Sequence, residues 1–228
     1  LDSMRVSIAR RNFLKVVCGF FDMSILNKVT VNELDRLASW SARYTTILRH
    51  AAPLTSILYN EFKGYRNHNV SLTPSAICKS AIIIWRCLLC LLEFDPQSYS
   101  RSLSSFSYQP PAYQIGFDAS LTGIGVGVTC LASKQLVAVT SFQFPFDLES
   151  NSKYQNTVEF IAVVTGLWVL YKKGIKDCAV ELKGDSQTAL KWGETERFKG
   201  ILNLGSVITF ILLGTHCNLW VSSSIHIA

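Results

Sequence analysis

Three acidic residues in the second half of the sequence stand where a carboxylate could do chemistry. Asp118 ends an apolar stretch and precedes small residues, through which another group could approach the main chain closely. Glu159 is the only charged residue in the apolar run 158–171, where a carboxylate needs a cation or strong hydrogen-bond donors to compensate its burial. Asp185 falls between a predicted strand and a predicted helix, a usual position for a site residue in mixed α/β sheets.

Each carboxylate also has a plainer interpretation. Asp118 by itself is typical of a turn, and Asp185 by itself more often caps a helix. Glu159 could lie in the first turn of a helix, where the helix dipole favours an acidic group. All three, however, are presented toward a common edge of the predicted sheet by core-facing strands or helices. Because clustered carboxylates repel one another unless they share cations, the combination predicts a site for divalent metal ions.

The elements that must position these carboxylates form a distinct pattern in the second half of the chain. Three stretches rich in β-branched and aromatic residues are separated by short turns and predict an antiparallel meander: 113–117, 123–131 and 136–144. The remaining elements are predicted as helices at 158–171, 186–192 and 201–213 and as strands at 179–183 and 218–225. This order predicts a mixed sheet with helices packed on it.

The first part of the sequence is predicted to be mostly helical. Thr30, Val31, Asn32 and Glu33 form a capping box, so a helix should begin there. Pro53 is expected to end or bend this helix before a short second one. Further on, residues 73 and 74 are Thr and Pro, which predicts a threonine cap with proline at the first helical position.

A segment rich in Ser, Gln, Pro and Tyr at 95–111 connects the two parts, and we place the domain boundary near residue 108. The division gives a helical region at 1–107 and a second domain at 108–228. Residues 1–110 carry 13 Lys and Arg against 7 Asp and Glu, whereas residues 111–228 carry 9 against 9. The excess positive charge of the first part could be a solvated surface or could bind phosphates.

Seven cysteines, most of them in apolar runs, favour reduced, buried thiols and an intracellular protein, in the cytoplasm or the nucleus. No signal peptide precedes them. The longest apolar stretches have 14 residues, and a membrane span needs about 20, so no membrane location is expected. The chain begins at Leu1 rather than Met and stops just after an apolar stretch, which suggests a fragment of a longer protein.

Weaker signals are interpreted structurally. Cys87 and Cys90 have a zinc-like spacing, but no second pair lies nearby, so core packing is favoured. Trp192 could stack on nucleic acid, although a core or rim position is the commoner role. His216 and His226 flank or occupy the last predicted strand, and each could be structural or near the site.

The segments around the three carboxylates resemble the metal-binding segments of ribonuclease H. They read Gly-Phe-Asp-Ala-Ser, Asn-Thr-Val-Glu-Phe-Ile-Ala and Leu-Lys-Gly-Asp-Ser-Gln-Thr-Ala-Leu, and the spacings of 41 and 26 residues also fit that family. More narrowly, the second domain resembles the ribonuclease H domain of a retroelement polyprotein. The segment Val-Thr-Val-Asn-Glu-Leu-Asp-Arg-Leu-Ala-Ser-Trp resembles the thumb or connection helices of retrotransposon reverse transcriptases. The resemblance implies a ribonuclease H-like, mixed five-stranded sheet with flanking helices, preceded by a mostly helical segment.

The same resemblance implies hydrolysis of the RNA strand of an RNA/DNA hybrid, with Mg²⁺ as the cofactor and Mn²⁺ as its substitute. Asp118, Glu159 and Asp185 would be the catalytic residues and the metal ligands. Asp118 would bridge two ions, and Glu159 would lie near the RNA 2′-hydroxyl. The implied partners are the hybrid and the polymerase portion of the same polyprotein.

Two features depart from the family pattern. The family has a fourth acidic residue on a helix after the last strand, and this chain ends at Ala228, where that strand finishes. No polymerase motif of the Tyr-x-Asp-Asp kind occurs. The alternative is therefore a catalytically inactive retroelement-derived remnant that acts as a nucleic-acid-binding or interaction module. An integrase-like nuclease is less favoured, because such enzymes usually lack a glutamate in the first helix after the meander.

Overall fold

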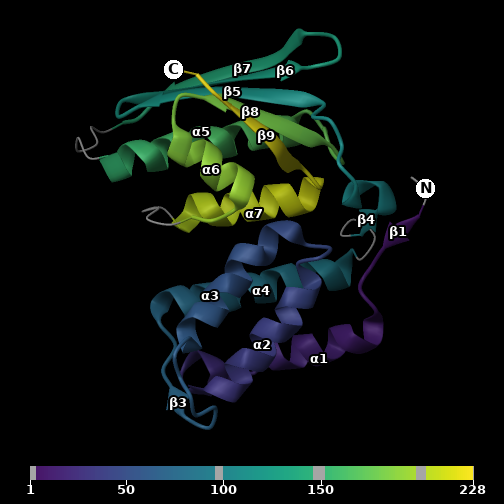
Figure 1. The fold of residues 1–228 in the computed structure, drawn as a ribbon, viewed down its shortest axis with the longest axis vertical. Coiled ribbons are helices and arrows are strands. Elements are labelled where there is room, and N and C mark those ends of the chain that lie inside the picture. The colour runs from purple at the N-terminus through teal and green to yellow at the C-terminus, as the bar shows by residue number, and fades with distance from the viewer. Residues whose placement is uncertain (1–3, 96–99, 146–151, 199–203, 228) are drawn as a thin grey trace. The chain divides into compact units, whose positions relative to one another are not determined.

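The computed structural model describes residues 4–95, 100–145, 152–198 and 204–227. The chain divides into two compact units, Leu1–Ser104 and Ser105–Ala228 (Figure 1). We refer to them as the helical unit and the sheet unit. Among the described residues, no helix has both the length and the apolar character needed to cross a membrane.

The helical unit consists mainly of α-helices that pack around an apolar core. Its described α-helices are α1 (Arg10–Phe21), α2 (Val31–Tyr44), α3 (Ala52–Phe62) and α4 (Ala76–Phe94). Two short antiparallel ladders pair β1 (Arg5–Val6) with β4 (Arg101–Ser102) and β2 (Val29–Thr30) with β3 (Ser71–Leu72). Fully buried side chains such as Phe20, Leu34 and Trp85 form the centre of the unit.

The capping box at the start of α2 is confirmed. The Thr30 hydroxyl accepts a hydrogen bond from the Glu33 amide at 3.2 Å, and the Glu33 carboxylate accepts one from the Thr30 amide at 2.8 Å. The predicted end of this helix near Pro53 is wrong, because α2 ends at Tyr44 and a turn then buries Leu48. Pro53 instead lies in the first turn of α3, where its missing N–H costs no helical hydrogen bond.

Two further expectations for the helical unit are corrected. The cap of α4 is Ser75 rather than Thr73: its hydroxyl accepts from the Cys78 amide at 3.2 Å while its own N–H and O–H donate to the Glu61 carboxylate. The expectation of buried thiols fails for Cys18, Cys87 and Cys90, which are exposed. Cys87 and Cys90 lie on the solvent side of α4. The buried face of this helix is formed by Ala81, Ile82, Ile84, Trp85, Leu88, Leu89 and Leu92.

The sheet unit contains a mixed five-stranded sheet in the order β7-β6-β5-β8-β9. Its strands are β5 (Tyr113–Ser120), β6 (Gly123–Cys130), β7 (Gln135–Gln143), β8 (Ala179–Gly184) and β9 (Trp220–His226). The first three strands form the predicted antiparallel meander, whereas β8 runs parallel to both β5 and β9. The helices are α5 (Ser152–Lys172), α6 (Gln187–Thr195) and α7 (Leu204–Cys217), which lie on one side of the sheet (Figure 1). This is the ribonuclease H-like fold class that the sequence predicted.

The alternation of side chains along β5 decides which of them face the helices. Ile115, Phe117 and Ala119 are buried, while Asp118 between them is exposed. Helix α5 packs closely on this strand, because a Cβ at Gly166 would clash with the Ile115 side chain. The packing of α5 against β5 therefore fixes both the strand and the helix that carry candidate site residues.

Candidate metal centre

Asp118 lies within β5, two residues before the strand ends at Ser120, so the strand runs further than predicted. Its register partner on β6 is Gly125. A Cβ at Gly125 would have no atom within 4 Å, which means that packing does not require glycine there. The strand pairing thus leaves open space beside the Asp118 carboxylate. The turn interpretation of Asp118 is wrong, because ladder pairing holds its main chain.

Glu159 is the buried member of the group. Helix α5 begins at Ser152, six residues earlier than predicted, so Glu159 lies beyond the first turn and the helix-dipole interpretation does not apply. The side chain is 2% exposed. Its Oε1 accepts a hydrogen bond from Gln155 Nε2 at 2.9 Å, whereas its Oε2 has no hydrogen-bond partner among the described residues. A buried carboxylate oxygen without a donor is unfavourable unless a cation compensates it.

Asp185 lies in the turn between β8 and α6, as the sequence predicted. The cap of α6 is its neighbour Ser186, whose hydroxyl accepts from the Ala189 amide at 3.2 Å. The capping interpretation therefore belongs to Ser186, not to the Asp185 carboxylate. The end of β9 fixes this turn: His226 Nε2 lies 2.8 Å from the Asp185 carbonyl oxygen. Because a carbonyl oxygen can only accept, Nε2 must carry the hydrogen.

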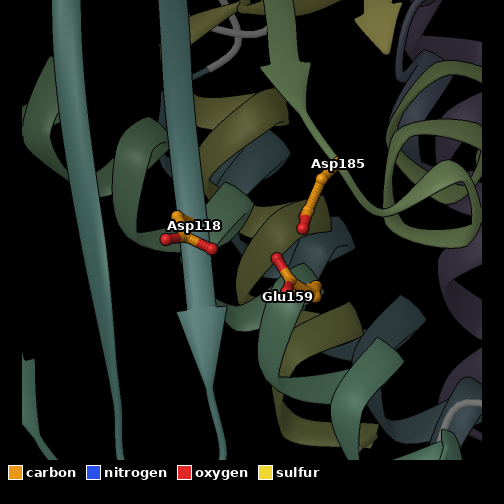
Figure 2. Close-up of side chains that lie close together, drawn as sticks. All are labelled: Asp118, Glu159 and Asp185. Atoms are coloured by element: carbon orange, nitrogen blue, oxygen red, sulfur yellow. The ribbon is translucent and has the colours of Figure 1, made fainter. Parts of the chain in front are cut away.

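The structure brings the three carboxylates together from three different elements. Asp118, Glu159 and Asp185 each offer one oxygen, and these oxygens all lie within 4.8 Å of one another. Figure 2 shows their side chains around a common space, with Asp118 on the strand, Glu159 on the helix and Asp185 on the turn. Their separations in the sequence are 41 and 26 residues, so the tertiary fold alone brings them together.

Burial and mutual repulsion change the acidity of Glu159. Burial is the main cause that raises the pKa of this carboxyl to about 7, and the charges of Asp185 and Asp118 raise it further. The hydrogen bond from Gln155 acts in the opposite direction, because it stabilises the charged form. The carboxyl therefore gives up its proton near neutral pH, where a cation could compete with that proton for the same oxygen.

The donor set fits a hard divalent cation. Within the described residues this is the one group of three or more acidic, His or Cys side chains close enough to hold a metal ion, and it consists only of carboxylates. Oxygen ligands of this kind suit Mg²⁺ or Mn²⁺, whereas zinc favours sites with Cys or His. The unpartnered Glu159 Oε2 is the atom that such an ion would satisfy.

Two residues support the carboxylate cluster from outside it. Gln155 Nε2 donates both to Glu159 Oε1 and, at 2.7 Å, to the Ala119 carbonyl oxygen, so it ties α5 to β5 next to Asp118. Gln155 was not among the predicted site residues, although its position four residues before Glu159 on the same helix was a usable signal. His226, for which two roles were left open, lies beside the Asp185 turn. Trp192 is 5% exposed, which confirms the core position.

A shallow hollow extends from Asp118 across the exposed face of the sheet. Its floor includes Gly116, Gly125 and Gly127, and Lys183 lies at its side. The glycines leave room for a ligand to approach the strand main chains closely. Lys183 and Asp118 both line this hollow.

Comparison with known proteins gives structural similarity only. No protein-family model and no curated protein sequence matches the chain. Ribonuclease H1 from the halophilic archaeon Halobacterium salinarum matches with a TM-score of 0.38 and 20% identity, over 50% of this chain and 84% of that one. The N-terminal ribonuclease H domain of a Mycobacterium tuberculosis protein, fused to maltose-binding protein, matches with a TM-score of 0.40 and 14% identity, over 51% and 84%.

A third match extends over both units. A foamy viral protease-reverse transcriptase, in complex with double-stranded DNA, matches with a TM-score of 0.33 and 9% identity. It covers 97% of this chain but only 36% of that one. At these identities the similarities concern the fold, and no residue role is carried over from them.

Proposed function

We propose that the sheet unit hydrolyses the RNA strand of RNA/DNA hybrids in a metal-dependent reaction, as part of a retroelement reverse transcriptase. The observation that carries this proposal is the carboxylate cluster, in which each residue offers one oxygen within 4.8 Å of the others and in which the buried Glu159 Oε2 has no hydrogen-bond partner among the described residues. The resemblance of the three sequence segments to ribonuclease H supports the choice of substrate.

Asp118, Glu159 and Asp185 would hold the metal ions and act as the catalytic residues. Bound Mg²⁺, or Mn²⁺ in its place, lowers the pKa of an attacking water and stabilises the leaving oxygen. The protein's own contribution is to position the ligands. Gln155 holds Glu159 by one oxygen and leaves the other available, and His226 holds the main chain of the Asp185 turn.

The substrate would approach across the exposed face of the sheet. Lys183 lies beside the glycine-floored hollow that contains Asp118 and could contact a phosphate of the hybrid. We assign residues 1–107 to a thumb or connection-like region and residues 108–228 to the ribonuclease H-like domain. The polymerase portion of the same polyprotein would then be the partner of both.

A second candidate function is binding without catalysis. Within the described residues the cluster has three carboxylates, whereas the family pattern has four. A retroelement-derived remnant that binds nucleic acid or another protein would keep the fold without cutting the hybrid. The two candidates differ in a single measurable property, which is cleavage of the RNA strand.

The test is cleavage of a labelled RNA/DNA hybrid by the purified chain with Mg²⁺, with Mn²⁺ and with EDTA. We expect metal-dependent cleavage of only the RNA strand, and its loss in Asp118→Asn. Asp35→Asn in α2 is the matched control, because it removes the same charge far from the cluster in sequence. Hybrid binding without cleavage by the folded chain would favour the second candidate. Cleavage that persists in EDTA or in Asp118→Asn would contradict the proposal.

A further inference from the structure

Helix α4 is apolar on its outward face as well as on its inward one. The charged residues of this 19-residue helix are Lys79, Arg86 and Glu93, whose spacing of seven places them along one line of its surface. We call them the charged line. Opposite the buried face of α4 lies a second row, the α4 stripe, whose members are mostly apolar: Ala76, Ser80, Ile83, Cys87, Cys90 and Phe94.

The α4 stripe is exposed to solvent. Ile83 is 48% exposed and Phe94 is 86% exposed, and apart from Ser80 all members of the stripe are exposed. A helix that is apolar on all sides is normally buried on all sides. The stripe is therefore a surface that a further apolar surface would cover.

Helix α1 widens this apolar surface on the side of the charged line. Arg86 Nε donates to the Phe20 carbonyl oxygen at 2.6 Å, so the end of α1 lies beside the middle of α4. The Arg86 guanidinium lies over the Phe21 ring, 5.7 Å from its centroid. Phe21 is 40% exposed, and Leu14, two turns earlier on the same side of α1, is 52% exposed. Exposed apolar surface that continues over two neighbouring helices is typical of an interaction site.

The spacing of the α4 stripe is that of a coiled-coil seam. Its members recur at alternating intervals of four and three residues, so one partner helix could contact all of them. The charged line borders the seam at the positions where paired helices form salt bridges between them. These two features favour another α-helix as the occupant of the stripe.

A second copy of α4 in antiparallel orientation matches the stripe in size. In the register that uses every stripe position, the small Ala76 lies opposite the large Phe94 of the second copy. The layers of this register pair the stripe positions of the two copies: Ala76 with Phe94, Ser80 with Cys90 and Ile83 with Cys87. Each layer occurs twice, because the interface of a symmetric dimer is the same on both copies.

The charged line is self-complementary in the same register. Lys79 lies beside Glu93 of the second copy, and symmetry repeats this pair at the other end. Among the described residues Lys79 has no ion pair, whereas Glu93 Oε1 accepts from Arg10 at 3.0 Å and leaves Oε2 for a second cation. Arg86, in the middle of the line, donates to main-chain carbonyl oxygens of its own chain. A parallel pair would place Lys79 beside the apolar Ile84 and leave its charge unmatched.

We propose that this protein forms a homodimer in which the α4 stripes of two copies pack against each other in antiparallel orientation. The helix dipoles then also lie in the favourable, opposed arrangement. The interface belongs to the helical unit and uses none of the three carboxylates. It does not rest on the proposed nuclease activity.

The test is sedimentation velocity of the full chain over a range of concentrations, in EDTA and a reducing agent, which exclude metal-bridged and disulfide-linked dimers. We expect a reversible equilibrium between monomer and dimer. Ile83→Gln with Phe94→Gln should weaken dimerisation by on the order of a hundredfold or more, because symmetry removes four apolar side chains from the interface.

The matched control for this variant is Leu136→Gln with Val139→Gln on β7, which removes two apolar side chains that are 61% and 67% exposed in the sheet unit. It should change the dimer affinity little. Because the substituted side chains are exposed in the single chain, thermal stability measured at low protein concentration should stay close to wild type in both double variants.

Charge exchange tests the orientation of the two helices. Lys79→Glu places like charges opposite each other at both ends of the interface and should weaken dimerisation by about tenfold at low salt. Adding Glu93→Lys to the same chain should restore most of the affinity, since opposite charges then face each other again. Lys63→Glu, outside α4, measures the effect of the change in net charge alone.

A disulfide cross-link tests the register. In a background of Cys18→Ser and Cys87→Ser, Ser80→Cys should form a disulfide with Cys90 of the second copy under mild oxidation, because the two positions share a layer. Mass spectrometry of the linked peptides identifies the pair. Ser56→Cys on the exposed side of α3 is the control and should not form this link.

Three results would overturn the proposal. They are a monomer at every concentration, a dimer that the Ile83 and Phe94 substitutions do not weaken, and a dimer that shows neither recovery on charge exchange nor the Ser80→Cys cross-link. Because sedimentation in EDTA does not depend on hybrid cleavage, none of these results bears on the nuclease proposal.

Discussion

The sheet unit and the helical unit each bury polar atoms that have no hydrogen-bond partner among the described residues, and these atoms include both acceptors and donors. In the sheet unit one of them is an acceptor, Glu159 Oε2 of the carboxylate cluster, and in the helical unit one is a donor, the Tyr44 hydroxyl at the end of α2. Glu159 belongs to a cluster whose carboxylate oxygens lie within 4.8 Å of one another, so a shared cation would compensate it, whereas no comparable group of acceptors lies beside the Tyr44 hydroxyl among the described residues. An unsatisfied buried atom therefore indicates a ligand only where further groups of the same chemistry lie beside it.

The net charge of a unit is a poor guide to its sites. The sheet unit has 9 Lys and Arg against 9 Asp and Glu, yet it gathers three carboxylates within 4.8 Å. The helical unit carries 13 against 7, but of these cations only Lys15 and Arg43 line the hollow between α1 and α2. Local geometry, rather than total charge, concentrates an electrostatic potential at a site.

The largest expected effect follows the removal of one carboxylate from the cluster of the sheet unit. Asp118→Asn should weaken Mn²⁺ binding and lower hybrid cleavage by at least about a hundredfold, since loss of even an outer-shell partner of a metal site costs about 10–100-fold. Isothermal titration with Mn²⁺, beside the Asp35→Asn control, measures the first effect. Unchanged Mn²⁺ affinity in Asp118→Asn would show that the carboxylate cluster is not a cation site.

The second prediction concerns the stability of the metal-free protein. Folding raises the pKa of Glu159 from its ordinary value of 4.5 to about 7, so the folded chain holds this proton more tightly than the unfolded chain. The stability contribution of the group is fully present below pH 4.5 and is lost as the pH rises through about 7, by at most about 3 kcal/mol. Glu159→Gln should remove this loss.

Urea denaturation in EDTA at about pH 5 and about pH 8 measures the difference between wild type and Glu159→Gln. The variant should be more stable than wild type at the higher pH and similar at the lower pH. An equal pH dependence of both proteins would mean that the Glu159 carboxyl does not titrate with a raised pKa. Asp118→Asn should have a smaller effect of the same sign, because it removes one of the two repelling charges.

A smaller effect is expected at Gln155, which supports the carboxylate cluster without belonging to it. Gln155→Leu leaves Glu159 Oε1 and the Ala119 carbonyl oxygen without this donor and should cost about 1–3 kcal/mol of unfolding free energy. The pKa of Glu159 should rise further, because the lost hydrogen bond lowered it. A double-mutant cycle with Glu159→Gln measures the coupling. Additive effects would show that Gln155 does not act through this carboxylate.

The smallest effect is expected at His226, whose side chain donates a hydrogen bond to the main chain of the Asp185 turn. His226→Ala should lower the cleavage rate modestly, up to about tenfold, with little change in hybrid affinity. His226→Gln should restore part of the rate, because its amide can donate a similar hydrogen bond. His68→Ala in the helical unit is the control. A loss that Gln does not rescue at all would contradict a positioning role.

Local signals in the sequence were sufficient where the interaction is local. The capping box of Thr30 and Glu33 joins residues three apart, and it starts α2 as predicted. The β-branched and aromatic residues of 113–117, 123–131 and 136–144, with the short turns between them, predicted the antiparallel meander correctly. The same signals failed at the cap of α4, which depends on a residue distant in the sequence. The Glu61 carboxylate accepts hydrogen bonds from Ser75, and Ser75 caps the helix instead of the predicted Thr73.

The start of α5 illustrates a second limit. Residues 152–157 are mostly polar, so the apolar pattern begins only at residue 158, yet the helix extends back to Ser152. The additional turn carries Gln155, whose amide links Glu159 to the main chain of Ala119. The link depends on a strand 36 residues away, which no local periodicity can indicate.

By itself the sequence determined the fold class and the types and order of the three carboxylates, because strand and helix periodicities and short motifs are local properties of the chain. Only the tertiary structure decided that one oxygen of Glu159 stays without a donor and that Lys15, Arg43 and Tyr44 border one hollow. Burial and hydrogen-bond satisfaction depend on contacts between distant segments. They are therefore set when the elements pack together and not by the residues of any one element.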